Sequence, residues 1–215
     1  MLDFSHACGF IFDCDGTLLD TMDAWDRAEQ MLFEAAGPLT GDQEDRIHAA
    51  PIEEAARILH GEFGAAESPQ AILDHLDAML MPYYRDEVKA LPGAVAFVRQ
   101  LREAAVPCVV VSSSPVRYLE AGLSRVGLRD CFEALVSTED CGISKQEPGI
   151  YALACEVLGC DPCRVWAVDD APYAVRAMGA FGLHTLGVGN GCSPERRREL
   201  QECATAYAET LESLL

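Results

Sequence analysis

The chain has 215 residues, half of them apolar, and a formal net charge of −19 at pH 7. That length and composition suffice for one large domain, or for one domain with a second inserted into it, and they are not typical of disorder. The acidic balance argues against nucleic acid or an anionic membrane as a partner, because both need a cationic surface, but it does not exclude small anionic substrates.

The N-terminus has no basic stretch typical of an export signal, and the apolar runs are too short to cross a bilayer. We therefore expect a cytoplasmic protein whose ten cysteines are reduced thiols and not a disulfide framework. Cys160 and Cys163 form a CxxC pair, but no second pair accompanies it. We interpret these two cysteines as small apolar fillers.

The first predicted element is a short strand over Gly9–Phe12 that ends at two acids, Asp13 and Asp15. Only helical periodicity follows, as far as about Ala90. Helices are expected over three stretches, which are Ala24–Ala36, Ile52–Phe63 and Ala71–Met81. Ser68 before Pro69 is typical of a helix start, and we assign Asp20 as the N-cap of a helix that begins near Met22.

Helices and strands alternate after Leu91. Strands are expected over Cys108–Val111, Ala134–Ser137, Val165–Val168 and, as the last, His184–Val188; helices are expected over Ala94–Ala104, Arg117–Val126, Pro148–Leu158 and Tyr173–Ala180. Such alternation predicts an α/β fold with a doubly wound, Rossmann-like parallel sheet. Residues 1–20 and 91–215 would form this core domain, and residues 21–90 an inserted all-helical domain.

Polar side chains stand at or just beyond the ends of four predicted strands. Asp13 and Asp15 follow the first, Ser112 the second, Lys145 lies in the loop after the third, and Asp169 and Asp170 end the fourth. Ligands bind outside the carboxyl ends of the strands in such sheets, so these groups should share one rim. Clustered carboxylates favour a hard cation such as Mg²⁺, and a cation beside a lysine and a hydroxyl can hold a phosphoryl group.

These residues resemble the motifs of the haloacid dehalogenase superfamily of phosphohydrolases. DCDGTLLD at 13–20 is similar to its first motif, Ser112 to its second, the lysine of GISKQEPGIY to its third, and VWAVDDAPYAVRAMGAFG at 165–182 to its fourth. The helical insert lies where subclass I of that family places its cap. The resemblance covers nearly the whole chain and implies a Mg²⁺-dependent phosphomonoesterase acting on a small phosphorylated metabolite, as a monomer or weak dimer.

By this resemblance, Asp13 would be the nucleophile and Asp15 the general acid and base, and both would meet the metal together with Asp169 and Asp170. Ser112 and Lys145 would hold the phosphoryl oxygens, with help from the backbone N–H groups of Cys14 and Ser113. The chain departs from the family at Gln146 and Gly149, where proline and aspartate are usual, and at Ala171, where serine is common. An aspartate at position 15 argues against the dehalogenase and phosphonatase branches.

Several roles stay open at this point. Trp25 can pack in the core or contact the substrate, and Arg27 and Arg46 are candidates for binding a second anionic group of the substrate. Thr21 can be a hinge or a cap, and Ser113 and Ser114 can be turn residues. The run Arg196–Arg198 is interpreted as a solvated helix face. Two alternative functions remain. One is a β-phosphoglucomutase-like phosphotransferase, a branch that usually carries a histidine where Trp25 stands; the other is a receiver-like domain phosphorylated on aspartate without turnover.

Overall fold

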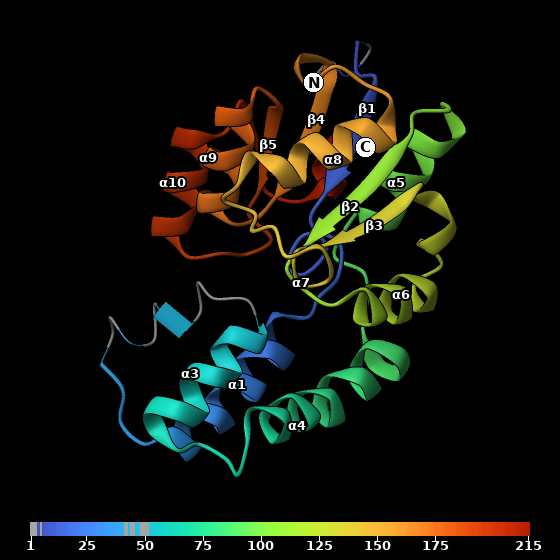
Figure 1. Ribbon diagram of the computed structural model, residues 1–215. Helices are drawn as coiled ribbons and strands as arrows, with labels where there is room; N and C mark the ends of the chain where they lie inside the picture. Colours follow the sequence, from blue (N-terminus) through green and yellow to red (C-terminus); the bar gives the residue numbers. More distant parts are fainter. Residues whose placement is uncertain (1–3, 5, 41–42, 44–45, 48–51) are drawn as a thin grey trace.

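The computed structural model describes residue 4 and residues 6–40, 43, 46–47 and 52–215. Its centre is a six-stranded sheet, all parallel, in the order β3-β2-β1-β4-β5-β6 (Figure 1). The strands are β1 (Gly9–Phe12), β2 (Cys108–Ser112), β3 (Ala134–Ser137), β4 (Val165–Asp169), β5 (His184–Val188) and β6 (Ala206–Ala208). The predicted doubly wound α/β fold is therefore confirmed.

Helices cover both faces of the sheet. One face packs against α8 (Pro148–Leu158), α9 (Pro172–Phe181) and α10 (Pro194–Cys203), and the other against α5 (Ala94–Glu103) and α6 (Val116–Arg125). All residues of β1 and β2 are buried, which is why both strands appear in the sequence as continuous apolar runs without alternation. The short helix α7 (Thr138–Cys141) and the 3₁₀ turns Arg129–Cys131, Pro162–Arg164 and Leu211–Leu214 complete the core.

The segment between β1 and α5 contains helices and no strand in the described residues. It comprises α1 (Met22–Ala36), α3 (Ile52–Phe63), α4 (Pro69–Pro82) and a π-helical turn, η1 (Tyr83–Glu87). These helices pack on one another beyond the carboxyl ends of the strands (Figure 1). Ser68 caps α4 as predicted, because its hydroxyl accepts a hydrogen bond from the backbone N–H of Ala71 at 3.1 Å. That residues 21–90 form a separate domain stays a prediction.

Two expectations about local structure are wrong. The sheet does not end at His184–Val188, because α10 and a sixth strand, β6, follow it. β6 pairs with β5 in parallel. Asp20 is not the cap of α1: Thr21 holds the N-cap position, and its side chain makes no capping bond because it donates to Asp15 instead. The backbone of Asp20 binds the far end of the insert, with its N–H donating to the Lys89 carbonyl and its own carbonyl accepting from Tyr83.

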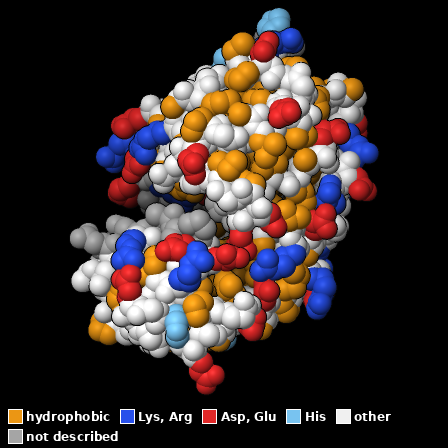
Figure 2. Space-filling view, in the orientation of Figure 1, with side chains coloured by type: hydrophobic (Ala, Val, Ile, Leu, Met, Phe, Trp, Pro, Cys, Tyr) orange, Lys and Arg blue, Asp and Glu red, His pale blue; other side chains and the backbone are white. Residues whose placement is uncertain are grey.

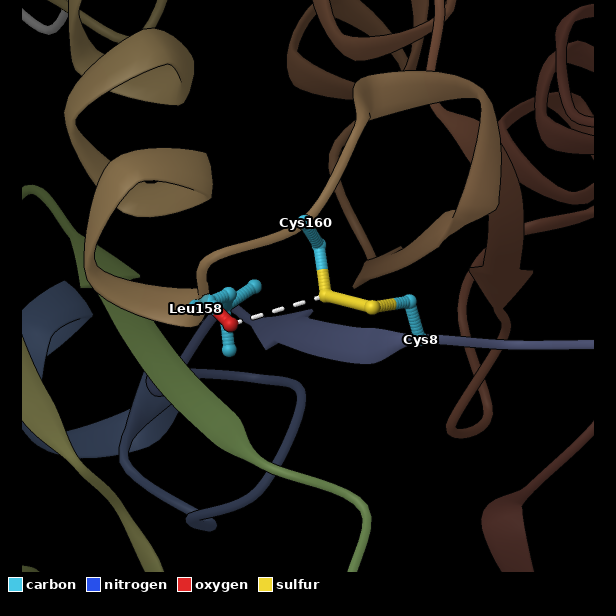
Figure 3. Close-up of a disulfide and its surroundings, with 3 residues drawn as sticks. All are labelled: Cys8, Leu158 and Cys160. Carbon is cyan, nitrogen blue, oxygen red and sulfur yellow. Dashed lines mark hydrogen bonds between the residues drawn. A yellow bond between two sulfur atoms is a disulfide. The ribbon is translucent and has the colours of Figure 1, made fainter.

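The expectation that all ten cysteines are reduced is also wrong. Cys8 and Cys160 form a disulfide that joins the residue before β1 to the loop after α8, across 152 residues of chain (Figure 3). The other eight cysteines are free. In the CxxC pair, Cys160 belongs to the disulfide and Cys163 is an exposed free thiol, so the two cysteines are not buried apolar fillers. Within the described ranges, none of the helices is long and apolar enough to span a membrane.

Candidate active site

Three carboxylates meet where the two central strands end. β1 pairs with β4 in parallel, and the N–H of Asp13 continues the ladder by donating to the carbonyl of Val168 at 2.9 Å. This register places Asp13 beside Asp169 and Asp170, all three of them buried. One oxygen of each lies within 4.8 Å of the others. The cluster sits at the point where the strand order reverses, the usual ligand position in a doubly wound sheet.

The turn after β1 is shaped to approach Asp170 closely. Gly16 has φ +81°, and a Cβ placed on it would lie 2.8 Å from the Asp170 Oδ2. Thr17 donates its hydroxyl to the other oxygen of Asp170 at 3.1 Å, and Asn190 donates its side-chain amide to the Gly16 carbonyl at 2.8 Å. The glycine of the DCDGT stretch is thus required both by its backbone angle and by the carboxylate in front of it.

Lys145 is buried inside the carboxylate cluster. Its Nζ donates to Asp13 at 2.5 Å and to Asp169 at 2.9 Å, and its carbonyl accepts a hydrogen bond from the hydroxyl of Tyr151 at 2.5 Å. Burial alone would lower the pKa of the ammonium, but the charges of Asp13 and Asp169 raise that pKa well above its ordinary value. Lys145 is therefore a charged member of the site and not a solvated surface lysine.

A second cation enters the cluster from α10. Arg196 donates Nη2 to the Asp170 Oδ2 at 2.8 Å and Nε to the Asp170 carbonyl at 2.9 Å. The expectation that Arg196–Arg198 is a solvated helix face is therefore wrong for its first member. Sequence reasoning could not find Arg196, because α10 has few apolar residues and nothing near Arg196 in the sequence points toward Asp170.

The charges of the cluster do not balance. Asp13, Asp15, Asp169 and Asp170 face only two cations among the described residues, Lys145 and Arg196. Burial, with the neighbouring charge of Asp13, raises the pKa of Asp170 to about 7 and that of Asp169 to about 6. An excess of two negative charges, with three carboxylates converging on one point, fits a bound divalent cation.

Asp15 is held by four hydroxyl groups. Its Oδ1 accepts from Thr21 at 2.7 Å and from Tyr84, and its Oδ2 accepts from Ser114 at 2.6 Å and more weakly from Ser112 at 3.4 Å. Burial and the charge of Asp13 raise the pKa of this carboxyl, while the hydroxyl donors lower it. A buried carboxyl with a raised pKa suits proton transfer better than an exposed one.

The residues at the end of β2 have distinct environments. Ser112 is buried and accepts a hydrogen bond from the backbone N–H of Ser114 at 3.0 Å, while Ser113 is exposed. Ser114 contacts Asp15 and is therefore more than a turn residue. Cys14 has a completely buried side chain, and burial raises the pKa of its thiol, so that only its backbone is left to meet a ligand.

The carboxylates face a cavity of about 500 Å³ between the sheet domain and the helical insert. Figure 2 shows the molecular surface hollowed between its upper and lower parts. Trp25 lines the cavity and also donates its indole N–H to Tyr84 at 2.8 Å, so it serves both packing and the cavity wall. Arg27 is exposed and does not line the cavity, and Arg46 pairs with Glu62 on the surface, so neither expectation of an anion-binding arginine is supported.

Comparison with known proteins agrees with this geometry. A sequence profile of haloacid dehalogenase-like hydrolases matches residues 9–182. Hexitol phosphatase A of Escherichia coli is 30% identical over 206 residues, which cover 89% of this chain and 88% of that one. N-acetylmuramic acid 6-phosphate phosphatase of Pseudomonas aeruginosa is 29% identical over 84% of this chain and 81% of its own. The crystal structure of a β-phosphoglucomutase from Clostridium difficile superposes with a TM-score of 0.75 at 18% identity, over 97% and 93% of the two chains.

Proposed function

The chain belongs to the haloacid dehalogenase-like hydrolases, and on that premise we propose that it hydrolyses phosphomonoesters of small metabolites through an aspartyl-phosphate at Asp13, with Mg²⁺ as cofactor. It is a phosphatase of this family, in keeping with its similarity to hexitol and N-acetylmuramic acid 6-phosphate phosphatases. The observation that carries the mechanism is the buried cluster of Asp13, Lys145, Asp169 and Asp170 at the floor of the cavity.

The first half-reaction needs a nucleophile, and Asp13 is the acid that suits it. An oxygen of Asp13 attacks the phosphorus, the ester P–O bond breaks, and the leaving alkoxide takes a proton from Asp15. Lys145 orients Asp13 and offsets the charge that builds on the phosphoryl oxygens. Ser112 and the backbone N–H groups of Cys14 and Ser113 would hold those oxygens.

The second half-reaction regenerates the enzyme. Asp15, now ionised, takes a proton from water, the water oxygen attacks the phosphorus, and the bond to Asp13 breaks to release inorganic phosphate. Asp13, Asp169 and Asp170 would hold the Mg²⁺ ion, with the backbone carbonyl of Asp15; the ion supplies charge neutralisation at the phosphoryl group when bound. Arg196 and Thr17 keep the Asp170 carboxylate in place for that purpose.

Hydrolysis is favoured over the mutase alternative by the first helix of the insert. The branch with mutase activity usually carries a histidine in this helix, whereas Trp25 stands there, and no histidine lines the cavity among the described residues. The shared fold does not separate the two activities. Release of inorganic phosphate from a sugar phosphate, measured against its isomerisation, distinguishes them directly. A receiver-like domain would show neither.

The variant Asp13→Asn tests the nucleophile. It keeps the size of the side chain, so the protein should fold with an unchanged circular dichroism spectrum, while steady hydrolysis of p-nitrophenyl phosphate with Mg²⁺ falls below about one per cent of the original rate. Asp23→Asn is the matched control, because Asp23 is exposed on α1 and outside the cavity. Activity above a few per cent in Asp13→Asn, with the control fully active, would make the nucleophile assignment wrong.

A further inference from the structure

Arg196 differs from the two arginines that follow it on α10. Its side chain is half-buried and lines the cavity whose floor holds the carboxylate cluster. Arg197 instead pairs with Glu209 at the surface at 2.7 Å, and Arg198 is exposed and does not line the cavity. The helix therefore presents one of its three consecutive cations to the site.

The start of α10 fixes the backbone of Arg196. Ser193 caps the helix, because its hydroxyl accepts a hydrogen bond from the backbone N–H of Arg196 at 3.2 Å. The loop before the cap is tied to the turn after β1, since the side-chain amide of Asn190 donates to the Gly16 carbonyl at 2.8 Å. The loop and the helix lie beyond residue 182, where the match to the family profile ends. The four motifs that the chain shares with the family therefore do not include Arg196.

The bonds to Asp170 use two of the three nitrogens of the Arg196 guanidinium. Nε donates to the Asp170 carbonyl at 2.9 Å, and Nη2 donates to Oδ2 at 2.8 Å. The third nitrogen, Nη1, takes part in neither bond. Because the guanidinium is planar and Asp170 holds one of its edges, the direction of the other edge is fixed as well. A cation that is already oriented binds a further anion at a small cost in conformational entropy.

Arg196 lies close to the place where phosphorus would react. An oxygen of Asp13, the proposed nucleophile, lies within 4.8 Å of an oxygen of Asp170. Asp13 and Arg196 are thus separated by a single carboxylate, that of Asp170. A phosphoryl group that Asp13 attacks brings negative charge to this part of the cavity floor, and a guanidinium is the side chain whose geometry best matches phosphoryl oxygens.

We propose that Arg196 binds the transferring phosphoryl group through Nη1, in addition to holding Asp170, and that it offsets the charge on the phosphoryl oxygens during transfer. This rests on the proposed phosphatase function and adds to it a phosphate-binding residue outside the family motifs. A residue that only held Asp170 would act on the bound cation, and on phosphate only through that cation. The two roles therefore differ in what happens to phosphate affinity when Mg²⁺ is saturating.

Binding of inorganic phosphate to the Mg²⁺-saturated protein, measured by calorimetry, tests the proposal and needs no turnover. Arg196→Gln should raise the Kd for phosphate at least about tenfold, because it removes a charged donor. Arg196→Lys keeps the charge but has one nitrogen in place of three, so it should still raise that Kd at least about threefold. The matched control is Arg197→Gln, which removes the neighbouring charge outside the cavity and should leave the Kd within about twofold.

Thr17→Val separates contact with phosphate from support of Asp170. Thr17 donates to the other oxygen of Asp170 and does not line the cavity, so valine disturbs the same carboxylate without removing a cation. Its Kd for Mg²⁺ should rise, while its Kd for phosphate at saturating Mg²⁺ should stay within about twofold of the original. An unchanged phosphate Kd in Arg196→Gln, or an equal rise in Arg196→Gln and Thr17→Val, would overturn the inference. Phosphate binding that depends on Arg196, in a protein that does not hydrolyse p-nitrophenyl phosphate, would overturn the phosphatase function and leave the binding role of Arg196 standing.

Discussion

The phenolic hydroxyl of Tyr84 donates a hydrogen bond to the carboxylate of Asp15, although 69 residues separate them in the chain. Tyr84 lies in the π-helical turn at the end of the insert, whereas Thr21, which binds the same oxygen, lies at its start. Both connections between the insert and the sheet therefore hold the proposed acid and base. The ring of Tyr84 is completely buried and stacks on Tyr118 at 5.2 Å, so its hydroxyl has a fixed position.

The variant Tyr84→Phe should slow catalysis without removing the fold. Phenylalanine keeps the packing but takes a donor from Asp15 and leaves the indole N–H of Trp25 without its acceptor. We expect kcat to fall about tenfold, a fraction of the roughly 10²–10⁴ that general acid–base catalysis supplies, with KM within about twofold. The free energy of unfolding should fall by about 1–2 kcal/mol.

Tyr83→Phe is the control for this variant. Tyr83 is the neighbour of Tyr84, and its hydroxyl binds the Asp20 carbonyl and not a carboxylate of the site. Steady-state kinetics and thermal denaturation on both variants separate the two roles. An unchanged kcat in Tyr84→Phe with a lowered Tm would show that the hydroxyl is structural only.

The sequence predicts the parts of the site that follow strand ends, because a parallel sheet brings the carboxyl ends of its strands to one edge. Asp13, Asp169 and Asp170 come together for this reason, and their clustering follows from topology and needs no knowledge of side-chain packing. Lys145 is reached the same way, since its loop follows β3 on the same edge. Whether these residues have the catalytic roles proposed for them stays a prediction.

The partners that the sequence does not reveal come from elements without a periodic signal. Arg196 lies on a strongly polar helix, and Tyr84 lies in an irregular turn after α4. β6 has only three residues, too few for a pattern, and the pairing of Cys8 with Cys160 depends on a distance between two segments 152 residues apart. Each of these depends on tertiary contacts, which local patterns do not encode.

Gly16→Ala should weaken cation binding through a steric contact. The new Cβ would lie 2.8 Å from the Asp170 Oδ2, and that carboxylate has little freedom to move because Thr17 and Arg196 hold it. Alanine at φ +81° also costs about 1 kcal/mol of stability. We expect the Kd for Mg²⁺, measured by calorimetry, to rise at least about tenfold, and activity at limiting Mg²⁺ to fall with it.

Gly191→Ala separates the steric contact from the backbone cost. Gly191 has φ +80°, and no neighbouring atom lies within 4 Å of the position that a Cβ would take there, so alanine carries the same backbone penalty and no clash. Gly191→Ala should lose only the stability that the backbone angle costs and keep its Mg²⁺ affinity, whereas Gly16→Ala should lose at least as much stability and also its Mg²⁺ affinity. Equal Mg²⁺ affinity in the two variants would contradict the close approach to Asp170.

The stability of the metal-free protein should fall as the pH rises. Asp169 and Asp170 have pKa values of about 6 and about 7 in the folded protein, raised by burial from about 3.9 in an unfolded chain. Between about pH 4 and pH 7 the folded state therefore binds more protons than the unfolded state, and its stability decreases with pH.

A bound cation offsets the charge of Asp169 and Asp170, so Mg²⁺ should raise the Tm more at pH 8 than at pH 5.5. Thermal denaturation with EDTA and with saturating Mg²⁺ measures both effects; a Mg²⁺ effect that is larger at pH 5.5 would contradict a site built on these carboxylates.

The disulfide between Cys8 and Cys160 should stabilise the fold without affecting catalysis. It ties the start of β1 to the loop before β4, at the end of the strands remote from Asp13. Closing a loop of this length restricts the unfolded chain, and removing such a bridge typically costs about 2–5 kcal/mol. Cys8→Ser should therefore lower the Tm by several degrees in non-reducing buffer and leave kcat at 25 °C within about twofold.

The matched control is Cys163→Ser, because Cys163 is an exposed free thiol three residues from Cys160 and takes no part in the bridge. Its Tm should equal that of the original protein, and adding dithiothreitol to the original protein should reproduce the Tm of Cys8→Ser. Titration of the denatured, unreduced protein should find eight thiols, since eight of the ten cysteines are free. Ten reactive thiols would mean that the bridge does not form in solution. Equal Tm values for Cys8→Ser and Cys163→Ser would mean the same, because removing a bridge of this span changes the entropy of the unfolded chain and hence the Tm.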